Sequence, residues 1–366
     1  MGVVSRMWRD SATLLVPAGL VAFVAAYCGL FSSAATQLIV TSALIKLVIV
    51  VGLFIFSGNS GIMSFGHLSF MAIGAYVCAL LTIPILQKQF LFEDFPSAGS
   101  FILDLQINPV VAALVAGLLA AVFAGLVGIP LMRMSGFQAS IATLALLIVV
   151  NVVISNWESV THGTSTLIGV PAVATLWNTL AVAEGAIVVA YLYLRSGRGL
   201  RLRAAREDPY AASSLGISVV LERLVGFALS AFVVGVAGAM YAFSNPFSAD
   251  TFYLTLTFYT IAVLVIGGQA SLWGAVLGAT LVSTFTEIMR VTETGMHVGG
   301  VRVTTPVGTT EVGLGLAMLI VLLVRPAGIT GGREAVWPWI AVRRWQSGRR
   351  GRGGDDLPAV DELPGI

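Results

Sequence analysis

The chain has 366 residues, of which 57% are hydrophobic and only 10% are charged, and its formal net charge is +2. Soluble globular proteins carry about 25% charged residues, so this composition excludes a soluble enzyme and a nucleic-acid-binding protein. It predicts an all-α fold of the polytopic helical membrane class.

The first apolar run follows two basic residues, Arg6 and Arg9, as the core of a secretory signal does. However, Ser11 to Phe31 carries no charge over about the length of a bilayer crossing, whereas a signal core spans about 7–15 residues. We therefore expect this run to be retained as the first membrane span, with a cleaved signal as the alternative.

Apolar runs recur along the chain and predict about ten spans. The eighth and ninth runs are short, and a re-entrant pair over 254–290 is the alternative. Residues 1–330 would form the transmembrane domain, and 331–366 a cytoplasmic tail that is partly disordered. The expected spans are 11–31, 36–56, 62–86, 109–131, 137–155, 176–194, 221–243, 254–270, 273–290 and 311–325.

Basic residues predict the orientation of these spans, because short cytoplasmic loops collect Lys and Arg. With the N-terminus inside, the expected outer segments hold only Lys88, Arg290 and Arg302, and Lys46 lies within a span. All other basic residues fall on the inner side, so we expect both termini to be cytoplasmic. The outer segments instead carry acidic residues: Glu93, Asp94, Asp104, Glu158 and Asp250.

The lone intramembrane charges of the expected spans are Lys46, Glu184 and Glu287. A charge inside the membrane is costly and marks a functional site by default. Glu184 and Glu287 lie near span ends, from which they can reach the interface. Lys46, near the centre of its span, is therefore the stronger candidate, and a pair between Lys46 and a glutamate across helices is left open.

A glycine- and serine-rich stretch, SGNSGIMSFGHLSFMAIGA at 57–75, lies between the second and third spans. We expect Gly58 to Gly61 to break the helix, and broken backbone at membrane depth is tolerated only where protein buries it or where it lines a wet cavity. His67 is then either a packed histidine or part of a polar solute path. The residues of that expected path are Asn59, Ser64, Gly66, His67 and Ser69, together with Lys46.

An outer loop with the sequence WESVTHGTSTLIGVP follows at 157–171. Loops of this composition are usually solvated connectors. Its hydroxyl groups and polar backbone are equally suited to a vestibule, so both interpretations stay open.

The longest strongly polar stretch between two apolar runs is RSGRGLRLRAAREDPYAASSLG at 195–216. Within it, Asp208 can cap a helix, Pro209 suits the first helical position, and Gly216 can take the left-handed conformation that ends the helix. We expect a helix of about two turns, which is too short to be stable alone. It either rests on lipid headgroups or is presented to a partner protein on the cytoplasmic side.

A second glycine-rich stretch, GGQASLWGAVLG at 267–278, is expected at the inner end of the eighth and ninth spans. Its glycines permit a tight turn and close helix packing. The glycines to which we assign structural roles in the two stretches are Gly58, Gly61, Gly267, Gly268, Gly274 and Gly278.

Few chemistries other than transport fit this sequence. It has no G-x-x-x-x-G-K-[ST] phosphate loop, so another chain must bind any ATP that is used. Cys28 and Cys78 lie in apolar runs and the three histidines are scattered, so we expect neither a disulfide scaffold nor a metal site. An intramembrane enzyme ranks last, since no nucleophile, base and metal ligands cluster.

Two transport hypotheses remain. The first is the permease of an ATP-driven importer, which the capped cytoplasmic helix and the missing nucleotide site favour. The second is a secondary transporter that uses Lys46, Glu184 or Glu287 as proton or ion sites, although so few intramembrane charges leave little for ion coupling.

Several segments, taken in order, carry a resemblance to a known family. They are the glycine–serine–glycine–histidine segment at 58–67, the outer loop at 161–171, the E-D-x-x-A-A-x-x-L-G-I segment within 201–217, G-G-x-x-S-L-W-G-x-x-L-G at 267–278, and R-P-x-G at 325–328. Together they resemble the permease subunits of branched-chain amino-acid ABC importers of the LivM type. The similarity covers about residues 40–330, and it is the ordered set that is specific.

The resemblance implies a transport subunit without enzymatic activity in a bacterial inner membrane. It implies two separate ABC ATPase subunits that bind Mg-ATP, a paralogous permease subunit as the second half of the pore, and an extracytoplasmic solute-binding protein. This chain itself would bind no cofactor and no metal. Its coupling helix would lie in the loop 195–220 and would contact the ATPase through Arg206, Glu207, Asp208, Pro209, Ala211, Ala212, Leu215 and Gly216.

The chain departs from the family pattern beside the expected path. Ile62 stands where the family often has Gln, and Leu53 stands where it often has Asn. Both changes remove a polar group. The expected solute is a branched-chain amino acid or a similar small polar solute, with urea or short amides as the alternative.

Overall fold

The computed structural model describes residues 3–92, 96, 101–298, 301–303, 306 and 308–335. The expectations for Glu93, Asp94 and the tail beyond Ala335 lie outside the described residues. The elements, in chain order, are α1 (Val3–Phe31), α2 (Ala34–Leu53), the π-helix η1 (Phe54–Gly58), α3 (His67–Thr82), α4 (Ile85–Leu91), α5 (Pro109–Leu131), α6 (Gly136–Asn156), α7 (Glu158–Thr161), α8 (Leu176–Arg195), α9 (Gly197–Glu207), α10 (Pro209–Ser214), α11 (Val219–Ala242), the 3₁₀-helix η3 (Ala249–Phe252), α12 (Leu254–Gly267), α13 (Leu272–Thr294), β1 (Met296–Val298), β2 (Val301–Val303) and α14 (Thr309–Val324).

Helices dominate the described part of the chain, and β1 and β2 form a small antiparallel hairpin. Eight helices are long and apolar enough to cross a membrane, and α3 and α14 are shorter apolar helices. These ten helices match the ten apolar runs of the sequence, which confirms the polytopic helical fold. The ninth run is longer than expected, because α13 continues to Thr294.

The break between the second and third spans is displaced from its expected place at Gly58–Gly61. The helix continues past Leu53 as a π-helical turn, Phe54–Gly58, and the irregular backbone begins at Gly61. The Asn59 side-chain amide donates to the Ile55 carbonyl over 3.0 Å at the end of this turn. The third helix consequently begins at His67 rather than at residue 62.

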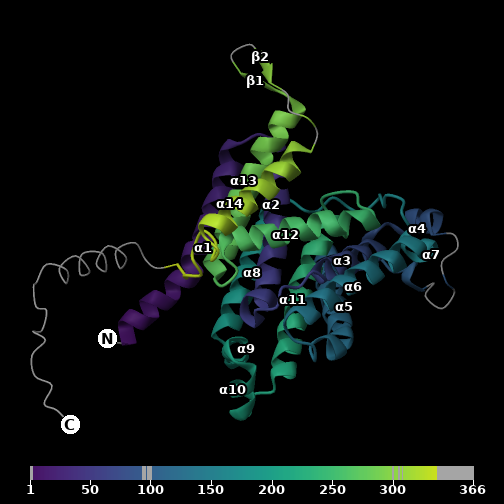
Figure 1. Cartoon of the computed structure of the whole chain (residues 1–366). Helices are drawn as coiled ribbons and strands as arrows, with labels where there is room; N and C mark the ends of the chain where they lie inside the picture. The colour runs from purple at the N-terminus through teal and green to yellow at the C-terminus, as the bar shows by residue number, and fades with distance from the viewer. Residues whose placement is uncertain are drawn as a thin grey trace, which may run out of the picture.

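Helix α11 lies at the centre of the bundle and packs against α2, α3 and α5 (Figure 1). Its crossing with α3 is closed by glycines. A Cβ atom added at Gly74 would collide with the carbonyl of Gly235, and one added at Gly238 would collide with the carbonyl of Met71. Small residues let two helix backbones approach this closely in membranes, where packing rather than water exclusion holds helices together.

Replacing Gly238 by valine is expected to lower the melting temperature of the detergent-solubilised protein by at least about 5 °C. The added side chain meets backbone, which cannot rotate away, so its cost should reach or exceed the roughly 1–3 kcal/mol of ordinary overpacking. Gly125→Val is the matched control, since nothing lies within 4 Å of a Cβ there. Equal melting temperatures for the two variants would show that the α3–α11 crossing is not close-packed.

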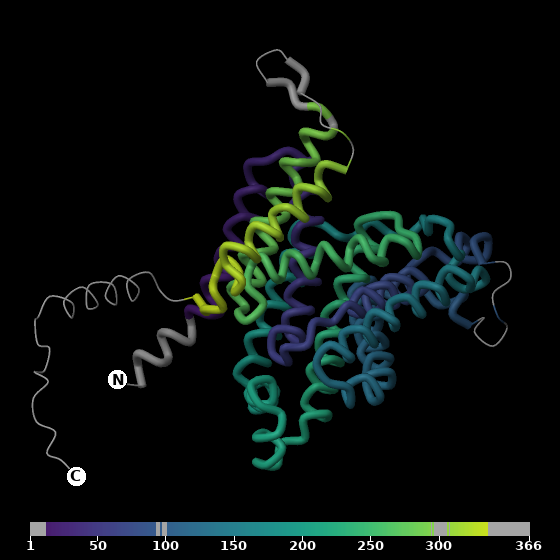
Figure 2. The backbone as a smooth tube through the Cα atoms, in the orientation of Figure 1, coloured from purple at the N-terminus to yellow at the C-terminus, as the bar shows by residue number. Residues whose placement is uncertain are grey.

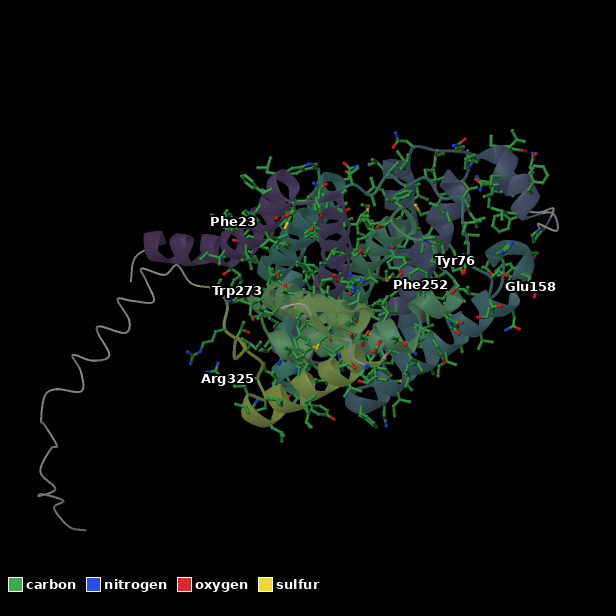
Figure 3. The ribbon with its side chains drawn as sticks, turned by 90° about the horizontal axis from the view of Figure 1, so that it is seen from above. Phe23, Tyr76, Glu158, Phe252, Trp273 and Arg325 are labelled. Carbon is green, nitrogen blue, oxygen red and sulfur yellow. The ribbon has the colours of Figure 1, made fainter. Side chains whose placement is uncertain are left out.

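The segment after α14 folds back onto the turn between α12 and α13. The amide of Ile329 donates to the Ile266 carbonyl over 2.9 Å, and the Glu334 carboxylate accepts from the amides of Leu272 and Trp273 at 2.9 and 3.3 Å. Figure 3 accordingly shows Trp273 and Arg325 on the same side of the molecule. Glu334 therefore caps the N-terminus of α13, although it lies outside that helix.

The stability that this cap provides should depend on pH with a defined sign. Burial raises the pKa of the Glu334 carboxyl, although the two amide donors oppose the shift. The folded protein then binds the proton more tightly than the unfolded chain, so stability falls as pH rises from the ordinary carboxyl pKa of about 4.5 through the raised value.

We expect the melting temperature of Glu334→Gln to rise relative to that of the unmodified protein as the buffer pH increases through this window. Because the two proteins share all other titrating groups, the difference between their melting temperatures at each pH reports residue 334 alone. A constant difference across the window would contradict the raised pKa.

The polar α9–α10 segment and the β1–β2 hairpin lie far apart. Helices α9 and α10 lie at one end of the molecule, and the β1–β2 hairpin lies at the other (Figure 1). Three apolar helices, α11 to α13, connect the two in sequence. That the polar loop and the outer connection before the last span face opposite sides of a membrane stays a prediction.

Candidate functional site

Helix α10 is ended at both sides by the residues that the sequence singled out. The Asp208 side chain accepts from the amides of Tyr210 and Ala211 at 2.8 and 3.0 Å, and Pro209 occupies the first helical position. Gly216 has a φ of 79°, and the amide of Ile217 donates to the Ala212 carbonyl over 3.1 Å. This pattern is the Schellman motif, so the predicted helix and its caps are confirmed.

The outer surface of α10 exposes apolar side chains. Tyr210 is 87% exposed and Leu215 is 81% exposed, while Ala212 is buried against the rest of the protein. Figure 2 shows the teal α9–α10 segment projecting beyond the ends of α8 and α11. A large exposed aromatic and a leucine on a rigidly capped turn are suited to insertion into an apolar groove of another protein.

The sequence analysis missed α9, which it treated as a basic loop. Its start signal is Ser196, whose hydroxyl accepts from the amide of Gly199 over 3.1 Å. Its buried face consists of Gly199, Leu202 and Ala205. A serine cap followed by small and apolar residues three apart is a recognisable helix pattern, but the four arginines of α9 masked it.

Three arginines of α9 reach three different parts of the bundle. Arg201 pairs with Glu222 at the start of α11, with 3.3 Å between Nη1 and Oε1. Arg203 donates to the carbonyl of Leu194 at the end of α8. Arg206 donates to the carbonyl of Gly58 over 2.6 Å. Helix α9 thus joins α8, α11 and the end of η1.

Most of the expected solute-path residues are packed inside the protein. The His67 ring lies against Phe56 and Phe227, with ring centres 5.7 and 5.4 Å away, and its Nδ1 is 2.8 Å from the Ser64 hydroxyl. Gly66 lies against the backbone of α6, since a Cβ there would come within 2.6 Å of the Thr143 carbonyl. The residues packed in this region are Asn59, Ser64, Gly66, His67 and Ser69, of which the four side-chain-bearing ones are almost fully buried.

Lys46 alone of the expected path residues lines a large cavity of about 890 Å³, as far as the described residues show. Its Nζ lies 4.8 Å from the centre of the Tyr259 ring, within range of a cation–π contact. Asp250 and Glu311 line the same cavity. The other lining residues are Met63, Phe65, Tyr241, Thr251, Thr255, Leu256, Phe258, Tyr259, Ile261, Ala262, Val265, Thr286, Thr310, Leu314, Gly315 and Met318.

The sequence analysis named neither Asp250 nor Glu311 as a site residue. Asp250 was assigned to an outer segment, and Glu311 lies at the start of the last apolar run. An acidic residue at the end of an apolar run is usually read as a group at the membrane–water interface. The tertiary packing is what brings these two residues to the cavity that Lys46 lines.

Glu287 was expected to be a lone intramembrane charge, and the structure corrects this. Arg290, one helical turn away, donates to both of its carboxylate oxygens. Glu184 is partly buried in α8. Among the described residues, no group of three or more His, Cys, Asp or Glu side chains is placed to hold a metal ion.

The outer loop at 157–171 is held in part by backbone pairing. The amide of Leu167 donates to the Phe247 carbonyl over 2.8 Å, and Leu167 is buried. The Thr161 hydroxyl donates to the carbonyl of Ile154 over 2.6 Å. The loop therefore packs on the protein at these points and is not a solvated connector along its whole length.

The second glycine-rich stretch forms the turn between α12 and α13. Gly268 has a φ of 116°, and a Cβ there would meet the Thr330 side chain. Gly267 and Gly274 lie so close that a Cβ on Gly267 would collide with the Gly274 carbonyl. A Cβ on Gly278 would come within 2.7 Å of Gly267 Cα, so the three glycines let α12 and α13 cross with their backbones nearly in contact.

Comparison with known proteins identifies the family that this chain matches. Residues 35–324 match a family described as branched-chain amino acid transport system, permease component. The chain is 28% identical over 287 residues to the high-affinity branched-chain amino acid transport system permease protein LivM of Escherichia coli (strain K12), an alignment that covers 69% of this chain and 63% of that protein. The chain thus spans less than two thirds of the length of this relative.

Two further relatives match shorter stretches. The nucleoside ABC transporter permease protein NupC of Lactococcus lactis subsp. cremoris is 34% identical over 144 residues, covering 37% of this chain and 44% of that protein. A probable branched-chain amino acid transport permease protein LivH of Methanocaldococcus jannaschii is 28% identical over 141 residues, covering 36% and 40%. No solved structure matches the chain.

Proposed function

This chain belongs to the family of branched-chain amino acid transport permease components, and from that premise we propose that it is the transmembrane permease subunit of an ATP-driven ABC importer. The subunit lies in the bacterial inner membrane with both termini in the cytoplasm. It carries no enzymatic activity and no cofactor of its own. Two ABC ATPase subunits bind and hydrolyse Mg-ATP, a paralogous permease completes the pore, and an extracytoplasmic binding protein delivers the solute.

The observation that carries this proposal is α10. A helix of six residues that is capped at both ends and exposes Tyr210 and Leu215 has no evident role inside this chain. Docked on an ATPase subunit, it would bury those two side chains and receive the motion that ATP binding produces. Within the proposed transmembrane domain, 1–330, the coupling loop is then 195–220.

The large cavity is the proposed solute path. Lys46 supplies a cation for a carboxylate group, and Asp250 and Glu311 supply anions for an ammonium group. Apolar and aromatic side chains such as Leu256, Phe258 and Met318 line the rest, as an aliphatic side chain requires. A branched-chain amino acid or a similar small polar solute therefore suits the cavity. The role proposed for Asn59, Ser64, Gly66, His67 and Ser69 is to hold the wall behind Met63 and Phe65.

The side of the membrane on which α10 lies tests this function directly. Tyr210→Cys is placed in a background in which Cys28 and Cys78 are replaced by alanine and is expressed without the ATPase subunits that would cover it, and intact cells are treated with a membrane-impermeant maleimide. We expect labelling only after the membrane is permeabilised. Labelling in intact cells would place α10 outside, where no ATPase can reach it, and would leave the ion-coupled secondary transporter as the better hypothesis.

The solute class has a second candidate. The nucleoside ABC permease among the relatives shows that similar sequences serve solutes without a carboxylate, and urea or short amides belong to the same alternative. Uptake by the complete transporter, measured with leucine, a nucleoside and urea, separates these classes. Uptake of leucine alone is the result expected from the charges that line the cavity.

A further inference from the structure

Arg206 lies where the projecting segment meets the interrupted backbone between α2 and α3. Its Nη1 donates to the Gly58 carbonyl over 2.6 Å, and the two residues are 148 positions apart in sequence. Its aliphatic chain lies over Gly61, which has a φ of 72°, and a Cβ on Gly61 would be 2.9 Å from Arg206 Cγ. The packing of the Arg206 side chain depends on glycine at position 61.

The backbone under Arg206 departs from regular helix. Phe54–Gly58 is π-helical, and after the bond from the Gly61 amide to the Ser57 carbonyl the amides of Ser64 and Phe65 bond to side-chain hydroxyls until α3 begins at His67. Isolated π turns and glycine-rich interruptions are frequent at functional sites and hinges of membrane helices. A Cβ on Gly58 would also come within 2.7 Å of the Gln269 carbonyl in the α12–α13 turn, so the interruption and this turn are in close contact.

The same interruption leads directly to the large cavity. Met63 and Phe65, two and four residues beyond Gly61, line it, and Lys46 lines it from α2 on the other side of the break. A continuous chain of contacts therefore runs from α10 through Arg206 to Gly58 and Gly61, and from there to the cavity wall. Asp208, the cap of α10, is only two residues after Arg206.

We infer that Arg206 is the positioning residue through which displacement of α10 reshapes the wall of the solute cavity at Met63 and Phe65. The inference rests on the proposed function, since it takes the displacement from an attached ATPase. Arg206 acts through the Gly58 and Gly61 backbone and touches no solute. The planar guanidinium donates to the carbonyl while its methylene chain packs over Gly61, a combination that neither lysine nor methionine reproduces in full.

The experiment follows the cavity wall with a thiol in the transporter purified together with its own ATPase. Met63→Cys is introduced with Cys28 and Cys78 replaced by alanine, and the rate of maleimide labelling is measured without nucleotide and with Mg-ATP plus vanadate. With Arg206 intact, nucleotide should change the rate about fivefold or more, as coupled sites typically do. ATPase co-purification is measured first, and Arg206→Met complexes that retain the ATPase should show no change, whereas Arg206→Lys should keep part of it.

Arg198→Met is the matched control, because it makes the same substitution at an exposed position of the same helix, and it should keep the full response. A full nucleotide response in both Arg206→Met and Arg206→Lys would overturn the inference while leaving the importer function in place. If the protein with Arg206 intact neither binds an ATPase nor shows a nucleotide response, the proposed function itself is contradicted. If Arg206→Met does not assemble, Arg206→Lys decides: a response equal to that of the control overturns the inference.

Discussion

Replacing Asp208 by alanine and Gly216 by valine together is expected to abolish binding of the ATPase and solute uptake, while the membrane bundle keeps its melting temperature. The two residues hold opposite ends of α10, and neither is part of the bundle core. The double variant therefore removes the helix without disturbing the spans.

The free-energy cost of the double substitution follows from the loss of the two helix caps. Removing the Asp208 carboxylate leaves the amides of Tyr210 and Ala211 without their acceptor, at about 1 kcal/mol. Valine at a φ of 79° adds about 1–2 kcal/mol of backbone strain, although there is open space for its side chain. A six-residue helix is too short to tolerate a loss of this size, which shifts its folding equilibrium about 30- to 150-fold.

The measurement is co-purification of the ATPase subunit, followed by solute uptake in reconstituted vesicles. Ser213→Ala is the control, because it alters α10 between the caps and leaves both in place. Normal uptake by the double variant would mean that α10 is not the element that engages the ATPase.

Replacing Lys46 by methionine is expected to reduce uptake of leucine by about 10- to 100-fold, with ATPase binding unchanged. Methionine keeps the length and apolar stem of the side chain but removes the charge that lies over Tyr259. A hydrogen bond to a charged group contributes about 1.5–3 kcal/mol, which sets the size of the loss.

The loss at Lys46 should depend on the charge of the solute. Lys46→Arg keeps a cation in the cavity and should retain most of the leucine uptake. If Lys46→Met transports leucine normally, the carboxylate of the solute is bound elsewhere. If it loses leucine and an uncharged solute equally, Lys46 supports the shape of the path rather than recognising the solute.

Features with local causes were predictable from the sequence. The ten apolar runs identified the helices, and Asp208, Pro209 and Gly216 identified α10 and both of its ends. A cap forms its hydrogen bonds within three or four residues, so the residues that make it are adjacent in the sequence. The Glu287–Arg290 pair is equally local, and its spacing of three could have been recognised.

Features that depend on packing were not predictable. The pattern Ser57 to Ser69 correctly indicated an interruption, but whether its polar groups face a cavity or each other depends on which helices surround it. The structure surrounds His67 with Phe56, Phe70 and Phe227 and leaves Lys46 to line the cavity.

By itself, then, the sequence determined the ten apolar helices of the described residues and that a capped turn lies in the basic segment, because each of these follows from hydrophobicity and hydrogen bonds over a few residues. Only the tertiary structure decided that α9 joins three parts of the bundle, that Arg206 donates to Gly58 across 148 positions, and that Asp250 and Glu311 share a cavity with Lys46. These contacts arise when close-packed helices cross, and the crossing points depend on glycine pairs such as Gly74 and Gly235 whose meeting no local pattern encodes.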